Sequence, residues 1–333
     1  MCIMAINIMG IGSYLPKKIM ANDEWQAYVD TTDEWIQSHT GIKERRIAND
    51  EESTAFMSVE SAKMALAMAG ISGQELDLIV VATATPDYLG FPATANLVQK
   101  ELNAVGAASF DVRAACSGFV YALSNAYALL KASKTMKYAL VVGAEKLSSI
   151  LNWHDRKTAV LFGDGAGAMV LYKDDRDGED DIVDFVLHSE GDPVALSRPA
   201  GGVKQPVVEE PSQSALHMDG ARVYRFGVRI LGELVEELSI RNALTMDDID
   251  WVVPHQANAR MIDALLERKG WPSDKFYMNI SQMGNTSAAS IPLALRQMYD
   301  EGKLKAGQHL LLVGFGAGLT WGGVYIRWNL QPK

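Results

Sequence analysis

The stretch 309-HLLLVGFGAGLTWGGVYIRW-328 decides the predicted fold, because two apolar segments flank the glycine-rich sequence GFGAG. The stretch 157-KTAVLFGDGAGAMVLYK-173 has the same plan, with GDGAG between two apolar segments. Each pattern predicts a strand, a tight turn and a second strand. Because the two stretches close the first and the second half of the chain, they indicate an internal duplication.

Helical and apolar patterns alternate around these two stretches. Helices are expected at 22–29, 54–70, 93–102, 219–242, 257–269 and 286–300, and strands at 1–16, 77–83, 107–111, 138–144 and 250–255. Short apolar strands between helices are typical of parallel sheets covered by helices. We therefore predict an α/β fold of two βαβ-type halves, residues 1–173 and 174–333, the second beginning with an irregular, acidic stretch over 174–218.

The composition excludes several classes of protein. The 333 residues are 48% apolar and 22% charged, which suits a globular chain with a sizeable core. The net charge of −10 argues against binding to nucleic acid or to an anionic membrane. Two cysteines form no disulfide framework, and the apolar start lacks the basic region of a signal peptide. The expected location is the cytoplasm.

One cysteine lies in a setting that suits a nucleophile. Cys116 occurs in 111-DVRAACSGFVYALSNAYALLKAS-133, between small residues at the expected start of a long apolar helix. A helix start favours a thiolate, and small neighbours let a substrate approach the backbone. Taken alone, a lone cysteine is more often a small buried apolar residue. Both interpretations stay open on the cysteine alone.

Two polar residues could assist such a cysteine. His255 follows the apolar run WVVP and precedes a helix, which is where ligands bind in open α/β sheets. Asn285 lies in a Gly-Asn-Thr-Ser turn that opens another helix. Taken singly, the histidine could be an ordinary loop residue and the asparagine a helix cap.

The chain resembles the β-ketoacyl-[acyl carrier protein] synthase III family of the thiolase superfamily, nearly from end to end. The resemblance rests on DTTDEWI (30–36), TGIKERRIA (40–48), AACSGF around Cys116, FGDGAGA (162–168), PHQANAR (254–260), GNTSAAS (284–290) and GFGAGLTWG (314–322). It implies a five-layered αβαβα fold, which agrees with the duplication. It also implies a homodimer, and it places Cys116, His255 and Asn285 at the family's catalytic positions.

The reaction implied by the resemblance is a decarboxylative condensation. Cys116 would take the acyl group of an acyl-CoA, and malonyl-[acyl carrier protein] would then lose CO₂ and attack the acyl-cysteine to give a β-ketoacyl product. Backbone N–H groups of Cys116 and Ala317 would bind the oxyanion, while His255 and Asn285 would stabilise the enolate as neutral donors. Phe315 would form the apolar wall of the malonyl pocket. No metal, flavin or nicotinamide cofactor is expected.

Further roles follow from the resemblance alone. Thr31, Trp35 and Arg156 would bind CoA, although His39 stands where the family usually has a third basic contact. Arg225 and Arg260 would contact the carrier protein and its phosphate, and Glu267 replaces a basic residue that some relatives have there. Phe91 would reach across the dimer and close the acyl pocket. Its size indicates a short primer such as acetyl.

Two alternatives to this reading are weighed on the same motifs. A specialised acyltransferase or condensing enzyme of secondary metabolism could use a longer acyl primer or another acceptor. A nucleotide-binding protein is disfavoured, because neither glycine turn has the spacing of a dinucleotide or phosphate loop. The six histidines have no metal-ligand spacing, and the acidic runs at 174–181 and 247–250 are expected to be a solvated loop and a helix start.

Overall fold

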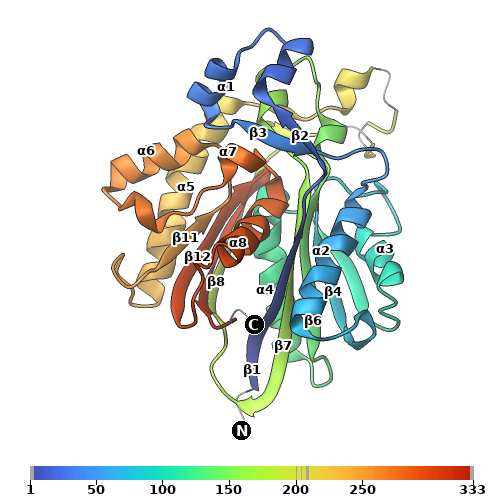
Figure 1. The fold of residues 1–333 in the computed structure, drawn as a ribbon, viewed down its shortest axis with the longest axis vertical. Coiled ribbons are helices and arrows are strands. Elements are labelled where there is room, and N and C mark those ends of the chain that lie inside the picture. Colours follow the sequence, from blue (N-terminus) through green and yellow to red (C-terminus); the bar gives the residue numbers. More distant parts are fainter. Residues whose placement is uncertain (1–3, 200, 204, 208–209, 331–333) are drawn as a thin grey trace.

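The computed structural model describes residues 4–199, 201–203, 205–207 and 210–330, so that Cys2 lies outside the described residues. Two sheets stand side by side with helices between them and on their outer faces (Figure 1). The first sheet has the order β1-β7-β6-β4-β5, and the second has the order β11-β12-β13-β8. Along the described chain, no helix combines the length and the apolar character needed to cross a bilayer.

The first sheet comes from residues 4–177. Its strands are β1 (Met4–Tyr14), β4 (Leu78–Ala82), β5 (Ala108–Val112), β6 (Tyr138–Glu145) and β7 (Gly165–Asp177). Strand β4 runs parallel to β5 and β6, while β7 runs antiparallel to β1 and β6. The runs LIVVA of β4 and ALVVGAE of β6 are buried throughout, as expected for strands covered on both faces.

The second sheet comes from residues 182–328. Its strands are β8 (Ile182–Asp192), β11 (Trp251–Pro254), β12 (Gln308–Gly316) and β13 (Gly318–Trp328). Strands β12 and β13 form the hairpin predicted from GFGAG, and β11 lies parallel to β12. The parallel strands β4, β6 and β11 all end near the site described below. Pro254, the last residue of β11, directly precedes His255 in the chain, and Glu145, the last residue of β6, accepts a hydrogen bond from Ser287.

Helices complete five layers. Helices α4 (Gly118–Ala132) and α8 (Ser290–Asp300) pack between the sheets, and one core cluster joins them to both. Helices α2 (Thr54–Ala69) and α3 (Thr94–Glu101) cover the outer face of the first sheet, and α5 (Gly220–Arg241) and α6 (Ala259–Lys269) cover the second. This is the αβαβα arrangement expected from the resemblance. Near the site, α1 (Asp33–Thr40), the short pair β2 (Lys18–Ala21) and β3 (Glu44–Ile47), and α7 (Ile280–Met283) cap one end.

The predicted strand before GDGAG is wrong. Residues Ala159–Leu161 form a 3-10 turn, and β7 begins only within the glycine-rich sequence at Gly165. The backbone before it pairs instead with the turn of Asn285, because Gly163 N donates to Asn285 O and Asn285 N donates to Leu161 O. A Cβ at Gly163 would lie 2.4 Å from the carbonyl oxygen of Met283, so glycine permits this close approach.

The prediction for the acidic stretch is also wrong, because 174–218 contains the long strand β8. Asp181 is buried, and its carboxylate accepts a hydrogen bond from Ile8 N at 2.6 Å. Asp180 accepts from Ile6 N at 2.6 Å and pairs with Lys131 at 2.8 Å. These two carboxylates therefore hold β1 against the start of β8 and are not a solvated loop.

Candidate active site

Cys116 lies in a short 3-10 turn, Ala115–Ser117, that leads directly into α4. It is 7% exposed, and Ala115 before it has a φ of 45°, a left-handed conformation rare outside glycine. The turn packs against the β12–β13 hairpin. A Cβ at Gly316 would lie 2.5 Å from Cys116 N, so only glycine allows the hairpin to come this close.

His255 follows β11 and is almost completely buried. Its backbone N–H donates to Val313 O at 2.8 Å, which extends the parallel pairing of β11 and β12 by one residue. Its ring nitrogen Nδ1 lies 2.8 Å from the hydroxyl of Ser290, at the start of α8. This contact leaves Nε2 as the ring nitrogen available to the cavity.

Asn285 is held by both its backbone and its amide oxygen. The oxygen Oδ1 accepts from Ser287 N at 2.9 Å, in the manner of a helix-capping turn. The capping role considered from the sequence is therefore real. It also orients the amide, since with Oδ1 engaged the Nδ2 group remains free to donate elsewhere.

The structure brings Cys116, His255 and Asn285 to one small cavity of about 30 Å³. Phe315 and Gly316 form part of its wall, and the Phe315 ring meets the His255 ring edge-to-face at 5.7 Å between centroids. Residues from both halves of the chain therefore form this cavity, which shares lining residues with two further cavities.

Burial decides the protonation of these groups. Together with the negative charge of Glu145, it raises the pKa of the Cys116 thiol to about 12, and the Ser287 hydroxyl and the Cys116 backbone N–H only partly oppose this rise. Burial also lowers the pKa of His255 to about 3, so this ring is neutral at physiological pH. The expectation that the helix start keeps Cys116 as a thiolate is therefore corrected, because the resting group is a thiol.

An apolar cavity of about 110 Å³ lies on one side of Cys116. It reaches from Ala317 and Ser287 toward a far wall that includes Arg198. Its other lining side chains are mainly aliphatic or aromatic, namely Ala84, Ala115, Leu147, Ile150, Phe162, Leu196 and Leu216. Ala317 keeps a negative φ, as an alanine there requires, and Gly318 beside it takes a φ of 141°.

A third cavity of about 180 Å³ leads from Asn285 to the surface at Trp35 and Arg156. It shares four lining residues with the central cavity, namely Met218, Val223, Ala257 and Asn285. The Arg156 guanidinium lies 4.4 Å from the centre of the Trp35 ring, and the His39 ring stacks on Trp35 at 4.2 Å. His39, which replaces the basic residue usual in the family, thus still places a planar group beside the tryptophan.

Thr31 lies beneath this surface site. Its hydroxyl is buried and has no hydrogen-bond partner among the described residues. An unpaired buried hydroxyl costs stability unless a ligand satisfies it. The neighbour of Thr31 in the chain, Asp30, accepts a hydrogen bond from Arg156 through its carbonyl oxygen.

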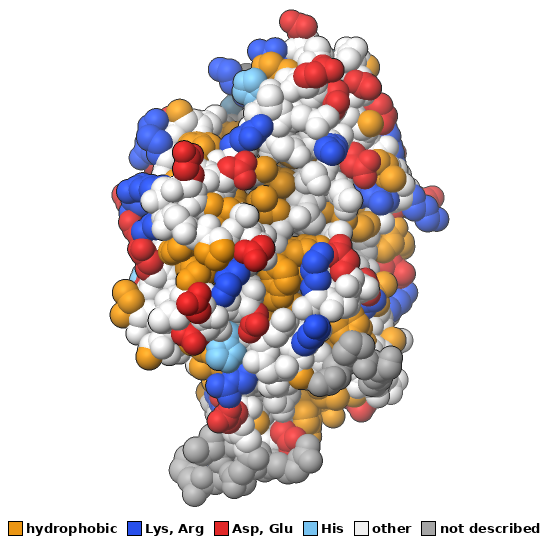
Figure 2. Space-filling view, turned by 60° about the vertical axis from the view of Figure 1, so that its left-hand side comes forward, with side chains coloured by type: hydrophobic (Ala, Val, Ile, Leu, Met, Phe, Trp, Pro, Cys, Tyr) orange, Lys and Arg blue, Asp and Glu red, His pale blue; other side chains and the backbone are white. Residues whose placement is uncertain are grey.

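Basic residues gather near this entrance on α5 and α6. Arg225 lines a shallow hollow of about 490 Å³ together with Arg229 and Arg268. Arg260 donates from Nε to Ser38 O at 2.9 Å and lies 3.5 Å from Asp263. Glu267 is exposed on α6. Figure 2 shows basic and acidic side chains interspersed on the face that it presents, so the basic area is local.

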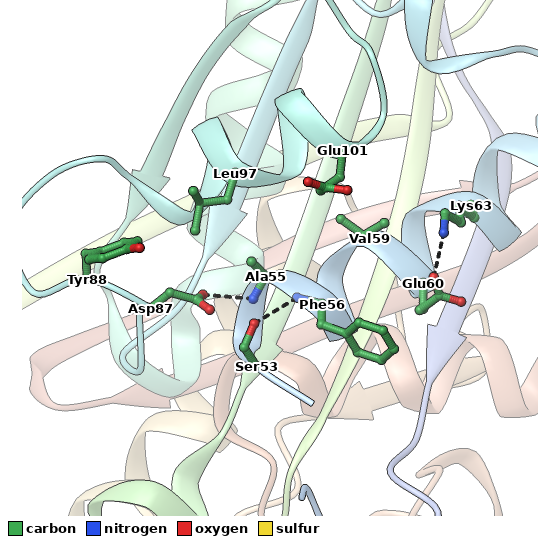
Figure 3. Close-up of a pocket in the computed structure, with 10 residues that line it drawn as sticks. All are labelled: Ser53, Ala55, Phe56, Val59, Glu60, Lys63, Asp87, Tyr88, Leu97 and Glu101. Carbon is green, nitrogen blue, oxygen red and sulfur yellow. Dashed lines mark hydrogen bonds and ion pairs between the residues drawn. The ribbon is translucent and has the colours of Figure 1, made fainter. Parts of the chain in front are cut away.

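Phe91 lies apart from all of these cavities. Its side chain is 94% exposed, which is extreme for a phenylalanine. A role at the acyl pocket would therefore need a second copy of the chain. A hollow of about 570 Å³ between α2 and α3 contains none of the predicted site residues (Figure 3). Its lining mixes Glu60, Asp87 and Glu101 with apolar side chains.

Comparison with known proteins identifies the family. The models for 3-Oxoacyl-[acyl-carrier-protein (ACP)] synthase III and for its C-terminal part match residues 110–191 and 240–328. A Beta-ketoacyl-[acyl-carrier-protein] synthase III of Chlorobaculum tepidum is 46% identical over 322 residues, or 95% of this chain and 97% of that protein. The chain belongs to the β-ketoacyl-[acyl-carrier-protein] synthase III family.

Solved structures agree with this membership. A 3-oxoacyl-[acyl-carrier-protein] synthase III from Aquifex aeolicus VF5 has a TM-score of 0.88 at 43% identity, covering 97% of this chain and all of that one. The corresponding enzyme of Pseudomonas aeruginosa PAO1 has a TM-score of 0.90 at 40% identity, covering 98% and 100%. This synthase III family member is thus a condensing enzyme of the acyltransferase class with the thiolase fold.

Several polar residues of this synthase escaped the reading of the sequence. Ser290 contacts the histidine, and Ser287 donates to the buried carboxyl of Glu145 and lines the acyl cavity together with Cys116. Thr320 on β13 meets Ser117 next to the nucleophile, with 2.8 Å between the two hydroxyl oxygens. The motif GNTSAAS contained both serines, and Glu145 follows an apolar strand, so a signal was present in each case.

Proposed function

We propose that this enzyme condenses a short acyl-CoA primer with malonyl-[acyl carrier protein], through an acyl-cysteine on Cys116. One observation carries the proposal: three adjoining cavities run from Trp35 at the surface, past Cys116, His255 and Asn285, to an apolar end. Such a path suits a long, thin substrate with its reactive thioester near one end. The products are a β-ketoacyl-[acyl carrier protein], CO₂ and CoA, and no cofactor takes part.

In the first half-reaction the Cys116 sulfur attacks the thioester carbonyl. The resulting oxyanion is stabilised by the backbone N–H groups of Cys116 and Ala317, and CoA leaves. Transfer from one thioester to another is nearly isoenergetic, so the acyl group remains reactive. The position of Ala317 on the wall that it shares with Cys116 supports this role.

In the second half-reaction the malonyl group loses CO₂ beside Phe315, and negative charge develops on its thioester oxygen. Asn285 donates from Nδ2, the side of its amide left free by Ser287. His255 donates from Nε2 in the tautomer whose Nδ1 accepts the Ser290 hydroxyl. The Ser290 hydroxyl lies 2.8 Å from both His255 Nδ1 and the Ser287 carbonyl, so this tautomer requires its proton to turn from that carbonyl to Nδ1.

The volume of the apolar end favours a short primer. This cavity encloses about 110 Å³, which leaves little room for a long acyl chain. That space suits a short group such as acetyl. Phe91 from a second copy of the chain would close this end further.

A homodimer follows from the exposed features on the first half. Strand β5 is the edge of the first sheet, and a long uncovered edge readily pairs with another strand. Phe91 lies on the loop before α3, and Val105 lies on the loop between α3 and β5. Both side chains are at least 90% exposed. Pairing of β5 with its copy would bury this apolar surface.

The entrance has to open before CoA binds. A base stacked between Trp35 and Arg156 needs about 7 Å between the two groups, and the present separation is 4.4 Å. The Arg156 guanidinium donates to Asp30 O at 2.8 Å, and this bond breaks or shifts when the base enters. The Thr31 hydroxyl would then gain the partner that it lacks.

The basic hollow on α5 provides a docking site for the acidic carrier protein. We expect Arg225→Glu to raise KM for malonyl-[acyl carrier protein] about tenfold, because one favourable charge contact becomes repulsive. Acyl loading from acyl-CoA should stay unchanged. Steady-state kinetics at low and high salt measure both effects, with Lys63→Glu on the remote helix α2 as the matched control. An equal effect of Lys63→Glu would show that the loss comes from the net charge of the protein and not from a local docking site.

The experiment that tests the function is intact-protein mass after incubation with acyl-CoAs from acetyl to dodecanoyl. A chase with malonyl-[acyl carrier protein] follows. A short acyl adduct on Cys116 that the chase converts to a β-ketoacyl carrier product supports the proposal. An adduct that forms only from long chains, or that survives the chase, supports instead a specialised acyltransferase with another acceptor.

A further inference from the structure

A buried carboxyl group from the first half of the chain supports an active-site turn of the second half. Glu145 is the last residue of β6, is 0% exposed, and forms no ion pair among the described residues. Its oxygens accept hydrogen bonds from Thr85 Oγ1 at 2.7 Å, Thr83 Oγ1 at 3.3 Å, Ala84 N at 3.1 Å and Ser287 Oγ at 3.0 Å. An ionisable group buried without a countercharge is costly to keep, which points to a function.

All of these hydrogen bonds are donated to Glu145, which suits an ionised carboxylate. A carboxylate has lone pairs on both oxygens and no proton of its own, so it can accept from every group around it. Burial raises its pKa to about 7 while the hydrogen bonds oppose the rise, and the ionised form therefore prevails at pH 8. Of these four donors, Ser287 is the one that belongs to the second half, where it lies two residues after Asn285.

Ser287 makes hydrogen bonds with all three of its polar groups. Its hydroxyl donates to Glu145 Oε1, and its backbone N–H donates to Asn285 Oδ1 at 2.9 Å. Its carbonyl oxygen lies 2.8 Å from the Ser290 hydroxyl, which in turn lies 2.8 Å from His255 Nδ1. One serine therefore contacts Asn285 directly and His255 through a single intervening hydroxyl.

The turn needs an anchor because its backbone is strained. Ser287 has a φ of 48°, a left-handed conformation that few non-glycine residues adopt and that persists only where the surroundings hold it. The turn lies directly on β6, since a Cβ at Gly143 would overlap the carbonyl oxygen of Ala288. Packing on β6 keeps the turn close, and the hydrogen bond to Glu145 fixes the orientation of Ser287 within it.

We propose that Glu145 is a positioning residue for the condensation step, because it holds the Ser287 hydroxyl and so fixes the turn of Asn285. The fixed turn directs Asn285 Nδ2 and His255 Nε2 at the malonyl thioester. Glu145 lines none of the three cavities of the substrate path, so it acts through Ser287 and does not contact the substrate. This inference rests on the proposed function, since it concerns the malonyl step of that reaction.

An anchor on β6 also explains how the two halves of the chain are set against each other at the site. The acyl group is carried by the first half on Cys116, whereas both enolate donors belong to the second half. A small rotation of the turn would leave the acyl group in place and misdirect the donors. The malonyl step should therefore depend on Glu145 far more than acyl loading does.

The test compares Glu145→Leu, which removes both acceptor oxygens, with Ser287→Ala, which removes only the linking hydroxyl. At pH 8 each variant should condense with malonyl-[acyl carrier protein] about tenfold more slowly with KM unchanged, because misdirected donors stabilise the enolate poorly. Neither should slow acyl loading more than about twofold, since backbone N–H groups bind that oxyanion. The double variant should be no slower than the slower single variant, because both changes break the same link.

The conservative variant Glu145→Gln separates the hydrogen bond from the charge. Its amide oxygen can still accept from Ser287, and its NH₂ group can donate to the Thr85 hydroxyl. Most of the wild-type malonyl rate should therefore be retained. A rate as low as that of Glu145→Leu would show that the negative charge, and not the anchoring of Ser287, is what the reaction needs, and would overturn the proposal.

Asp181→Leu is the matched control for the loss of a buried carboxyl. Asp181 is also buried and accepts from Ile8 N and Asn329 Nδ2, but it lines none of the three cavities of the substrate path. This variant should lose stability and keep the wild-type ratio of malonyl rate to loading rate. If it lowers that ratio as much as Glu145→Leu does, general destabilisation explains the loss and the proposal fails.

Hydrogen exchange of the turn gives a readout that needs no substrate. Backbone amides of residues 284–290 should exchange about tenfold faster in Glu145→Leu and Ser287→Ala than in wild type, and at the wild-type rate in Asp181→Leu. If Glu145→Leu does not fold, Ser287→Ala carries both comparisons.

The outcomes distinguish this inference from the proposed function. Wild-type exchange of the turn, or a wild-type malonyl rate, in Glu145→Leu and Ser287→Ala would overturn the anchor. A wild-type enzyme that neither loads nor condenses would refute the proposed function. Faster exchange in the two variants would in that case still support the anchoring of the turn by Glu145, and unchanged exchange would refute it as well.

Discussion

Cys116→Ala is expected to form no acyl adduct with any acyl-CoA, and Cys116→Ser to form none within the time in which wild type is fully acylated. Cys116 is the free cysteine among the described residues, and it lines both the acyl cavity and the central cavity, as the unreactive side chains of Phe162 and Leu196 also do. A serine hydroxyl is a far weaker acid than a thiol, and burial weakens it further. Intact mass after acyl-CoA incubation measures the loss directly.

Fold integrity is the control for this result. Both variants should keep the wild-type unfolding temperature within a few degrees, since alanine and serine fill nearly the same space at the start of α4. An adduct of acyl mass on Cys116→Ala that maps to another residue would show that the nucleophile has been assigned wrongly.

His255→Ala and Asn285→Ala are each expected to load acyl groups normally and to lose about 10²–10³-fold in the malonyl step, the usual cost of removing one oxyanion donor. The expected split arises because both residues face the enolate, while the acyl oxyanion is bound by backbone N–H groups. Pulse loading followed by a malonyl-[acyl carrier protein] chase separates the two rates. Normal condensation by Asn285→Ala would contradict the claim that His255 and Asn285 stabilise the enolate as two neutral donors.

Asn285→Asp provides a sharper comparison than alanine. The aspartate retains the oxygen that accepts from Ser287 N, so the turn keeps its anchor. It replaces the free Nδ2 donor with a negative charge that repels both the enolate and the malonyl carboxylate. We expect this variant to be slower than Asn285→Ala, and a faster one would show that the turn, and not the donor, sets the rate.

The sequence predicted those elements whose causes are local. The hairpin β12–β13 and the apolar strands β4 and β6 were recognised because their residues alternate or run together within a few positions. Strand β8 was missed because Asp180 and Asp181 look like solvent-facing residues. Their partners, Ile6, Ile8 and Lys131, are more than 45 residues away in the chain.

The site shows the same division. The motifs predicted which residues approach one another, and the structure places Cys116, His255 and Asn285 at one cavity. Their protonation could not be predicted, because it depends on burial by segments from both halves. A helix start indicated a thiolate at Cys116, whereas desolvation in the closed cavity outweighs that local effect. Glu145 escaped notice for the same reason, since a charged residue after a strand usually faces water.

The protonated state of Cys116 also governs how the idle enzyme survives oxidative stress. Peroxides convert a thiolate to sulfenic acid and then to irreversible sulfinic and sulfonic acids, while the neutral thiol reacts slowly. Since burial keeps the Cys116 pKa high, we expect the resting sulfur to be oxidised slowly between turnovers. The burial that raises the pKa of Cys116 would thus also protect the nucleophilic sulfur from irreversible oxidation.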